Sequence, residues 1–299
     1  MIFKNQYYYF ISGLPDFSFD SMKLPFSVEE FREMLDEAVT PEDKKLLDSY
    51  FLSYDNDNLF RLLEKKEEEE LQSRGILTRA DLEEVIRQVR EGDTIENKQV
   101  PPYFEKAVRA WLDEEIPGHL KTLEDLISSL YADYGMGVKN SLIAGWFEMN
   151  LNIGNILSAL FARKYGMDIS QVVVGNNEIA QLIRENANAR DFGISRELDY
   201  YDDIIRIAEE PDIYERERKI DKFRWNWLDD NTLFDYFNIE YIFAYLCMLR
   251  ILERWVSLNA EEGERVFREL ITQLKNEIQQ PEDLNWQCFS PAGIDQNGR

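Results

Sequence analysis

The chain has 299 residues, and its 58 acidic against 34 basic side chains give it a formal net charge of −24. Charge of this sign repels phosphate backbones and anionic lipid surfaces over about 8 Å in physiological salt, so it argues against a nucleic acid partner. Hydrophobic residues make up 44% and aromatic residues 13% of the sequence, which is enough apolar surface for folded cores and argues against disorder.

The length predicts two or three packed modules or one elongated body. The aromatic run Tyr7–Ile11 is short and is followed by Pro15 and Asp16, so we expect no signal peptide. The longest apolar stretch, Tyr241–Leu249, is far shorter than the roughly 20 residues that cross a bilayer. With only Cys247 and Cys288 present, we expect no disulfide framework. We therefore expect a cytoplasmic location.

Helix start signals recur in the first half of the chain. Ser27 with Glu30 is a capping-box pattern and predicts a helix over 28–38. Thr40 followed by Pro41 predicts a helix over 41–53. Thr78 opens a third helix over 79–90, in which apolar residues recur at spacings of three and four. The segment 91–102, with Gly, Asp, Asn and two prolines, is the expected boundary or linker.

Helical patterns continue through the second half, and strand-like alternation is limited to 171–174. The sequence therefore predicts a mainly α fold. The expected helices cover 103–115, a segment from 122 onward, 146–165, 176–188, 196–209, 212–229, 234–256 and 260–279.

A weak internal repeat begins at Asp55, Asn152 and Asn238. In each copy a polar residue is followed three positions later by a second position that is mostly polar, then by an apolar pair and a leucine. Because a short polar side chain can cap a helix, each copy is expected to start a core helix.

Motifs for catalysis are scarce. His119 is the only histidine, which excludes multi-histidine zinc sites and limits nucleophilic systems to that one residue. Gly135–Lys139 lacks the Walker A spacing and is expected to be a hinge. Asp55–Asn58 resembles the opening of a calcium loop without its later ligands. Acid pairs such as Asp229–Asp230 are common by chance in so acidic a chain. From these observations together, we predict no catalytic residue, no cofactor and no metal.

Aromatic residues gather between Phe223 and Phe243, among them Trp225, Phe234 and Tyr241. Such residues usually belong to a core, because each buries a large area. Any that protrude are expected to mark a surface that binds another protein.

The segment Phe147–Gly166 resembles a helix of the family of C-type subunits, also called d-type subunits, of rotary V/A-type ATPases. Residues that match its pattern of a polar residue, an Asn–Ile/Leu pair and a following arginine are Asn152, Asn155, Ile156, Leu157 and Arg163. The opening Tyr7–Pro15 and the stretch Asp191–Gly193 resemble an uncharacterised bacterial family associated with V-type ATPase gene clusters.

This resemblance implies three similar helical lobes in a pseudo-threefold funnel, which we expect at 1–100, 101–210 and 211–299. It also implies a non-catalytic central-stalk component between the central shaft and the proteolipid rotor ring, at the cytoplasmic face of the membrane and bound to it only through the ring. Asn152, Asn155 and Arg163 are the candidate partner-binding residues. A structural role, as a cap or an ion pair within one lobe, is the alternative for each.

Two other functions stay open. One is an assembly or regulatory factor of the same ATPase, which would bind transiently. The other is an unrelated soluble helical enzyme, which would require His119 in a pocket beside carboxyl groups with shifted pKa values.

Overall fold

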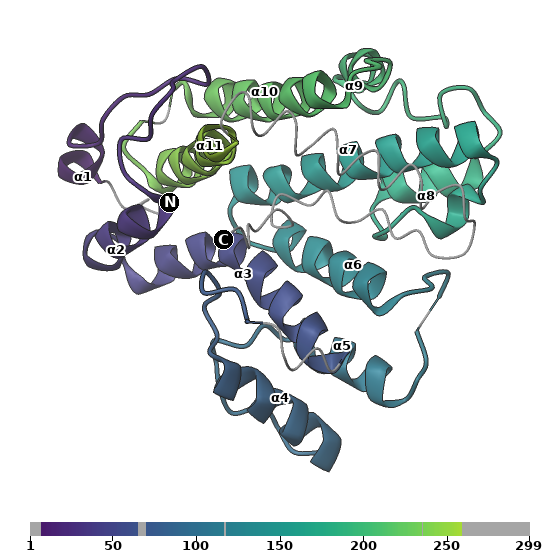
Figure 1. Ribbon diagram of the computed structural model, residues 1–299, viewed down its shortest axis with the longest axis horizontal. Coiled ribbons are helices and arrows are strands. Elements are labelled where there is room, and N and C mark those ends of the chain that lie inside the picture. The colour runs from purple at the N-terminus through teal and green to yellow at the C-terminus, as the bar shows by residue number, and fades with distance from the viewer. Residues whose placement is uncertain (1–6, 65–69, 117, 235, 259–299) are drawn as a thin grey trace. The chain divides into compact units, whose positions relative to one another are not determined.

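The computed structural model describes residues 7–64, 70–116, 118–234 and 236–258. Within these residues the chain forms eleven α-helices, one short 3-10 helix and no strand, so the predicted mainly α class is confirmed. The expected helix 260–279 and Cys288 lie outside the described residues. The α-helices, labelled in Figure 1, are α1 (Tyr8–Ser12), α2 (Val28–Ala38), α3 (Pro41–Leu63), α4 (Arg79–Glu91), α5 (Tyr103–Leu112), α6 (Leu123–Met136), α7 (Ser141–Tyr165), α8 (Glu178–Glu185), α9 (Tyr201–Ala208), α10 (Ile213–Thr232) and α11 (Ile239–Ser257). The 3-10 helix η1 (Ile169–Gln171) lies between α7 and α8 in sequence.

Short polar side chains fix where most helices begin. Ser27 and Glu30 form the predicted capping box at α2, and Thr78 and Asp81 form the second one at α4. At α3 the Thr40 hydroxyl accepts a hydrogen bond from the Asp43 N–H, as expected of a cap. These bonds satisfy amide groups that have no partner within the first helical turn, so the start signals identified the correct positions.

The described residues form two compact units. One holds residues 7–45 and 202–258, and the other holds residues 46–201. Neither matches the ranges 1–100, 101–210 and 211–299, because the first unit combines the two ends of the described chain. The segment 91–102, expected to be a boundary or linker, lies inside the second unit. The three-lobed funnel therefore stays a prediction.

Apolar helix faces build the core of the 46–201 unit. In this unit α5 packs against α4 and α6, α6 against α7, and α7 against α8 (Figure 1). Phe104, Ala107 and Val108, at helical spacing on α5, are fully buried against Leu82 of α4 and Ile127 of α6. Their burial removes a large apolar area from water and holds these helices together.

A buried carboxylate joins α10 to α11 in the other unit. Asp221 on α10 accepts hydrogen bonds from the Trp255 indole at 2.9 Å and from Arg224 at 2.9 Å, and it lies 3.2 Å from the Arg254 guanidinium. Arg254 also pairs with Glu217 at 2.8 Å. A charge buried in this way needs partners at most of its lone pairs, so the network fixes how these two helices align.

The predicted hinge at Gly135–Lys139 is instead the end of α6 and the turn after it. Gly135 lies against the Phe147 ring of α7, and a β-carbon at this position would lie 2.2 Å from ring atoms. Glycine is needed here for close helix packing.

We expect Gly135→Ala to lower the free energy of unfolding by about 1–3 kcal/mol, because the buried Phe147 ring must shift to make room for the added carbon. Gly154→Ala on α7 is the matched control, since among the described residues no atom outside the local backbone of α7 lies within 4 Å of the added carbon. It should raise stability by about 0.5–1 kcal/mol through helix propensity. Urea unfolding followed by circular dichroism measures both, and equal shifts for the two variants would contradict the packing account.

Candidate partner-binding surface

The structure places Asn152 and Asn155 in the interior of the 46–201 unit, where each is 1% exposed. The Asn155 side-chain amide pairs with both backbone groups of Val174, accepting from its N–H at 2.9 Å and donating to its carbonyl at 2.8 Å. Asn152 accepts from Asn177 at 2.8 Å and donates to the Tyr200 hydroxyl at 3.2 Å. Together the two asparagines bind the segment that leads into α8.

Arg163 fastens a second loop of the same unit. Its guanidinium donates to the carbonyls of Ala187, Ala189 and Arg190 at 2.9, 2.6 and 2.8 Å. It also lies 3.8 Å from the centroid of the Phe192 ring, within cation–π range. The described contacts of all three sequence candidates are therefore internal, and their role in partner binding stays a prediction.

Asp55 and Asn58 on α3 repeat this arrangement. Asn58 pairs with both backbone groups of Gln72, accepting at 2.7 Å and donating at 3.0 Å. Asp55 accepts from the N–H groups of Ile76 and Leu77, both at 2.9 Å. The second polar residue of the first two copies, Asn58 or Asn155, thus does the same thing: its side chain binds both backbone groups of one residue in the segment leading into the next helix. The first residues differ, since Asp55 binds backbone N–H groups and Asn152 binds the side chains of Asn177 and Tyr200.

The expectation that each copy starts a helix is wrong for the first two. Asp55 and Asn152 lie well inside α3 and α7, because their side chains serve a distant loop and not the helix terminus. The third copy does begin a helix: Asn238 caps α11, and its side chain accepts from the Tyr241 N–H at 3.2 Å.

Asp57 lies between the two polar residues on α3, and its pKa is shifted. Burial raises its pKa to about 6, and the nearby Arg61 offsets only part of that increase. Within the described residues no group of three or more His, Cys, Asp or Glu side chains is arranged to hold a metal ion.

Exposed aromatic side chains gather in the unit of residues 7–45 and 202–258. We call Tyr8, Tyr9, Phe234, Tyr236 and Phe237 the aromatic patch; Tyr9 is 98% and Phe234 92% exposed. These residues come from α1 and from the segment between α10 and α11. The Tyr8 and Phe237 rings are 4.5 Å apart, and the Tyr7 N–H donates to the Phe237 carbonyl at 2.7 Å.

Tyr7 connects the aromatic patch to the start of α3. It is buried, and its hydroxyl donates to Asp43 at the start of α3. Exposed aromatic groups held on a fixed backbone are typical of protein-binding surfaces. The aromatic segment predicted from the sequence therefore divides into buried members such as Trp225 and exposed members such as Phe234. The part contributed by Tyr8 and Tyr9 was missed, because so short an aromatic run shows no helical period of its own.

His119 and Cys247 lie apart from this surface. The His119 Nε2 atom is 3.0 Å from the Val173 carbonyl oxygen and 3.3 Å from Arg184, so its described hydrogen-bond partners include no carboxyl group. Cys247 is buried, as predicted, and burial raises the pKa of its thiol well above the usual value, which makes the thiol unreactive. No helix among the described residues has the length and apolarity to cross a bilayer.

We expect Asn155→Ala to destabilise the protein by about 2–3 kcal/mol, because both backbone groups of Val174 lose their partner. Asn58→Ala should cost a similar amount through Gln72. Hydrogen exchange should report local opening at Val174 in the first variant and at Gln72 in the second. Unchanged stability and protection in Asn155→Ala would contradict the internal role.

We expect Asp57→Asn to stabilise the protein at pH 8 by about 2 kcal/mol and to have little effect at pH 4. The folded pKa of Asp57 lies above the unfolded value, so its favourable contribution is present at low pH and is lost as pH rises through about 6. Unfolding free energies at the two pH values measure the difference. A gain of the same size at both would show that ionisation of Asp57 is not the cause.

Comparison with known proteins gives a family and no relative of known function. A family model described as "Protein of unknown function (DUF2764)" matches residues 4–278. No curated protein and no solved structure matches the chain. Since the match covers most of the 299 residues, the chain belongs to the DUF2764 family.

Proposed function

We propose that the chain is a non-catalytic component of a V/A-type rotary ATPase that occupies the place of the C/d-type stalk protein. In this role it links the central shaft to the proteolipid rotor ring at the cytoplasmic face of the membrane. It contacts the membrane only through the ring. Its work is mechanical: packed helices resist deformation while surface side chains grip neighbouring subunits.

The aromatic patch is the observation that carries this proposal. A side chain as exposed as Tyr9 or Phe234 loses apolar contact with water only when another molecule covers it. Large aromatic residues supply much of the binding energy in protein interfaces. The patch thus supports a protein-binding role, and the resemblance of Phe147–Gly166 and Tyr7–Pro15 to ATPase-associated families supplies the identity of the partner.

The paired polar residues of α3 and α7 give further support. Asn58 and Asn155 hold their loops in the same manner, which suits a body built from repeated helical elements. The resemblance to the C/d-type family implies such repetition.

The test is affinity purification of the tagged full-length chain from native membranes in mild detergent, with quantitative mass spectrometry. We expect catalytic and proteolipid subunits in a constant ratio to the bait. The double variant Tyr9→Ser/Phe234→Ser should reduce their recovery by about tenfold or more. Met22→Ser, which removes an 86% exposed side chain outside the patch, should retain them.

Other outcomes would redirect the proposal. Recovery of the bait alone would contradict a role in the ATPase. Recovery of ATPase subunits only from incompletely assembled complexes would identify an assembly or regulatory factor. Equal recovery with the patch variant and the Met22 control would show that a different surface makes the contact.

A further inference from the structure

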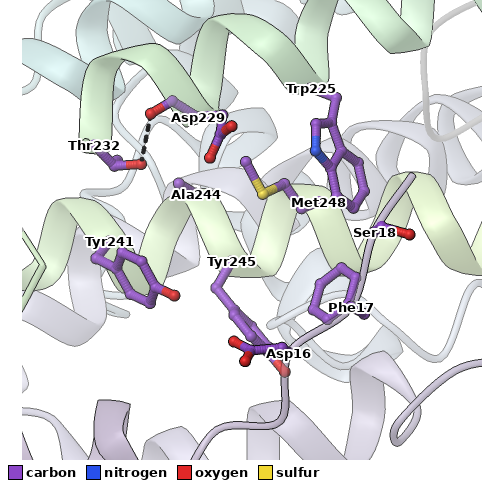
Figure 2. A pocket seen from close by; sticks show the side chains of 10 residues that line it. All are labelled: Asp16, Phe17, Ser18, Trp225, Asp229, Thr232, Tyr241, Ala244, Tyr245 and Met248. Atoms are coloured by element: carbon purple, nitrogen blue, oxygen red, sulfur yellow. Dashed lines mark hydrogen bonds between the residues drawn. The ribbon is translucent and has the colours of Figure 1, made fainter. Parts of the chain in front are cut away.

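A pocket of about 320 Å³ lies in the unit of residues 7–45 and 202–258. Its wall comes from α10, from α11 and from the segment 16–18 (Figure 2). Trp225 and Asp229 belong to α10, while Tyr241 and Tyr245 belong to α11, so the helix pair joined by Asp221 also builds the pocket.

Aromatic rings form much of this wall. Phe17 makes edge-on contacts with Trp225 at 5.6 Å and with Tyr245 at 4.9 Å between ring centroids. The Tyr245 hydroxyl donates to the Pro15 carbonyl at 2.9 Å, which fixes its ring and the segment beside it. Rings held in this way present their faces and edges in constant positions to a ligand.

Two carboxyl groups, Asp16 and Asp229, line the pocket, and none of the described residues that line it is a lysine or an arginine. Within the described residues neither carboxyl group has an ion pair or a side-chain hydrogen bond. Their charge reaches the pocket, because Asp16 and Asp229 both add to the effect of burial in raising the pKa of Tyr241. Carboxylates beside aromatic rings are the surroundings that suit an organic cation.

Trp225 contributes a hydrogen-bond donor, its indole N–H, to the pocket. Its side chain is 7% exposed, and among the described residues its indole N–H has no acceptor. Figure 2 shows the indole nitrogen on the edge of the ring that faces Met248 and Asp229. An indole N–H on the edge of a ring that lines a pocket can donate to an acceptor of a bound ligand, such as a peptide carbonyl.

We propose that this pocket binds the cationic side chain of an arginine or lysine of a partner protein. The ammonium or guanidinium group lies between Asp16 and Asp229, its apolar stem lies along Tyr241 and Tyr245, and a main-chain carbonyl of the same peptide accepts from Trp225. The choice of a partner protein over a free amine rests on the proposed function and on continuity with the aromatic patch, since the Tyr236 and Tyr241 rings are 5.8 Å apart. The preference for a cation does not depend on that function.

The first experiment uses the full-length chain labelled with ¹⁵N and the probe N-acetyl-arginine methylamide. Its neutral control is N-acetyl-citrulline methylamide, which has nearly the same shape without the charge. The Trp225 indole signal, assigned by its loss in Trp225→Phe, should shift with saturation at millimolar probe and not respond to the citrulline compound.

Variants of the two pocket carboxyl groups then test whether their charge binds the probe. Asp16→Asn and Asp229→Asn should each weaken binding of the arginine probe by about fivefold or more. Asp230→Asn is the matched control, an exposed neighbour on α10 that does not line the pocket. Equal response to the citrulline compound, or equal weakening by Asp230→Asn, would overturn the proposal. The first would show that charge is not recognised, and the second would attribute binding to the net charge of the chain.

The source of the cation is tested separately by co-purification with the double variant Asp16→Asn/Asp229→Asn. We expect one partner to be lost while the variant still folds with unchanged circular dichroism. Unchanged partner recovery together with normal arginine binding by the wild type would overturn the partner-protein source and indicate a free amine. If the probe fails to bind but the wild type still recovers ATPase subunits, the pocket proposal fails and the proposed function stands.

Discussion

The interior of the 46–201 unit depends on buried asparagine side chains that pair with the main chain of a neighbouring segment. An asparagine side chain carries one carbonyl and one amino group, so it can bind both backbone groups of a single residue as a neighbouring strand would. Asn58 binds Gln72 in this way and Asn155 binds Val174. These loops lead into α4 and α8, so each asparagine positions the segment that precedes the capping residue of the next helix.

The sequence predicted the local features well, because their causes are local. A hydroxyl or carboxyl group three residues before a partner amide determines a helix start, and α2 and α4 begin where expected. The same reasoning failed at Asp55 and Asn152, where a polar side chain of the same type serves a loop 20 or more residues away in sequence. Such distant pairing leaves no periodic signal. The three-residue spacing of the repeat was therefore visible, while its structural role was not.

The surface was predictable only in part. The aromatic segment 223–243 was found from composition, yet only the structure separates buried Trp225 from exposed Phe234. The contribution of α1 depends on a contact between Tyr8 and Phe237, which lie at opposite ends of the described chain. The division into two units, with the chain ends combined in one of them, also arises from contacts of this long-range kind.

The most direct test of the proposed role is photo-crosslinking from the aromatic patch in intact cells. A benzophenone amino acid at Phe234, in the full-length chain, reacts with whatever covers that position. The proposal predicts one predominant adduct, formed with a central-shaft or proteolipid component of the ATPase, and no such adduct from the same amino acid at Met22. A predominant adduct at Phe234 with an unrelated protein, or none above the Met22 background, would contradict it.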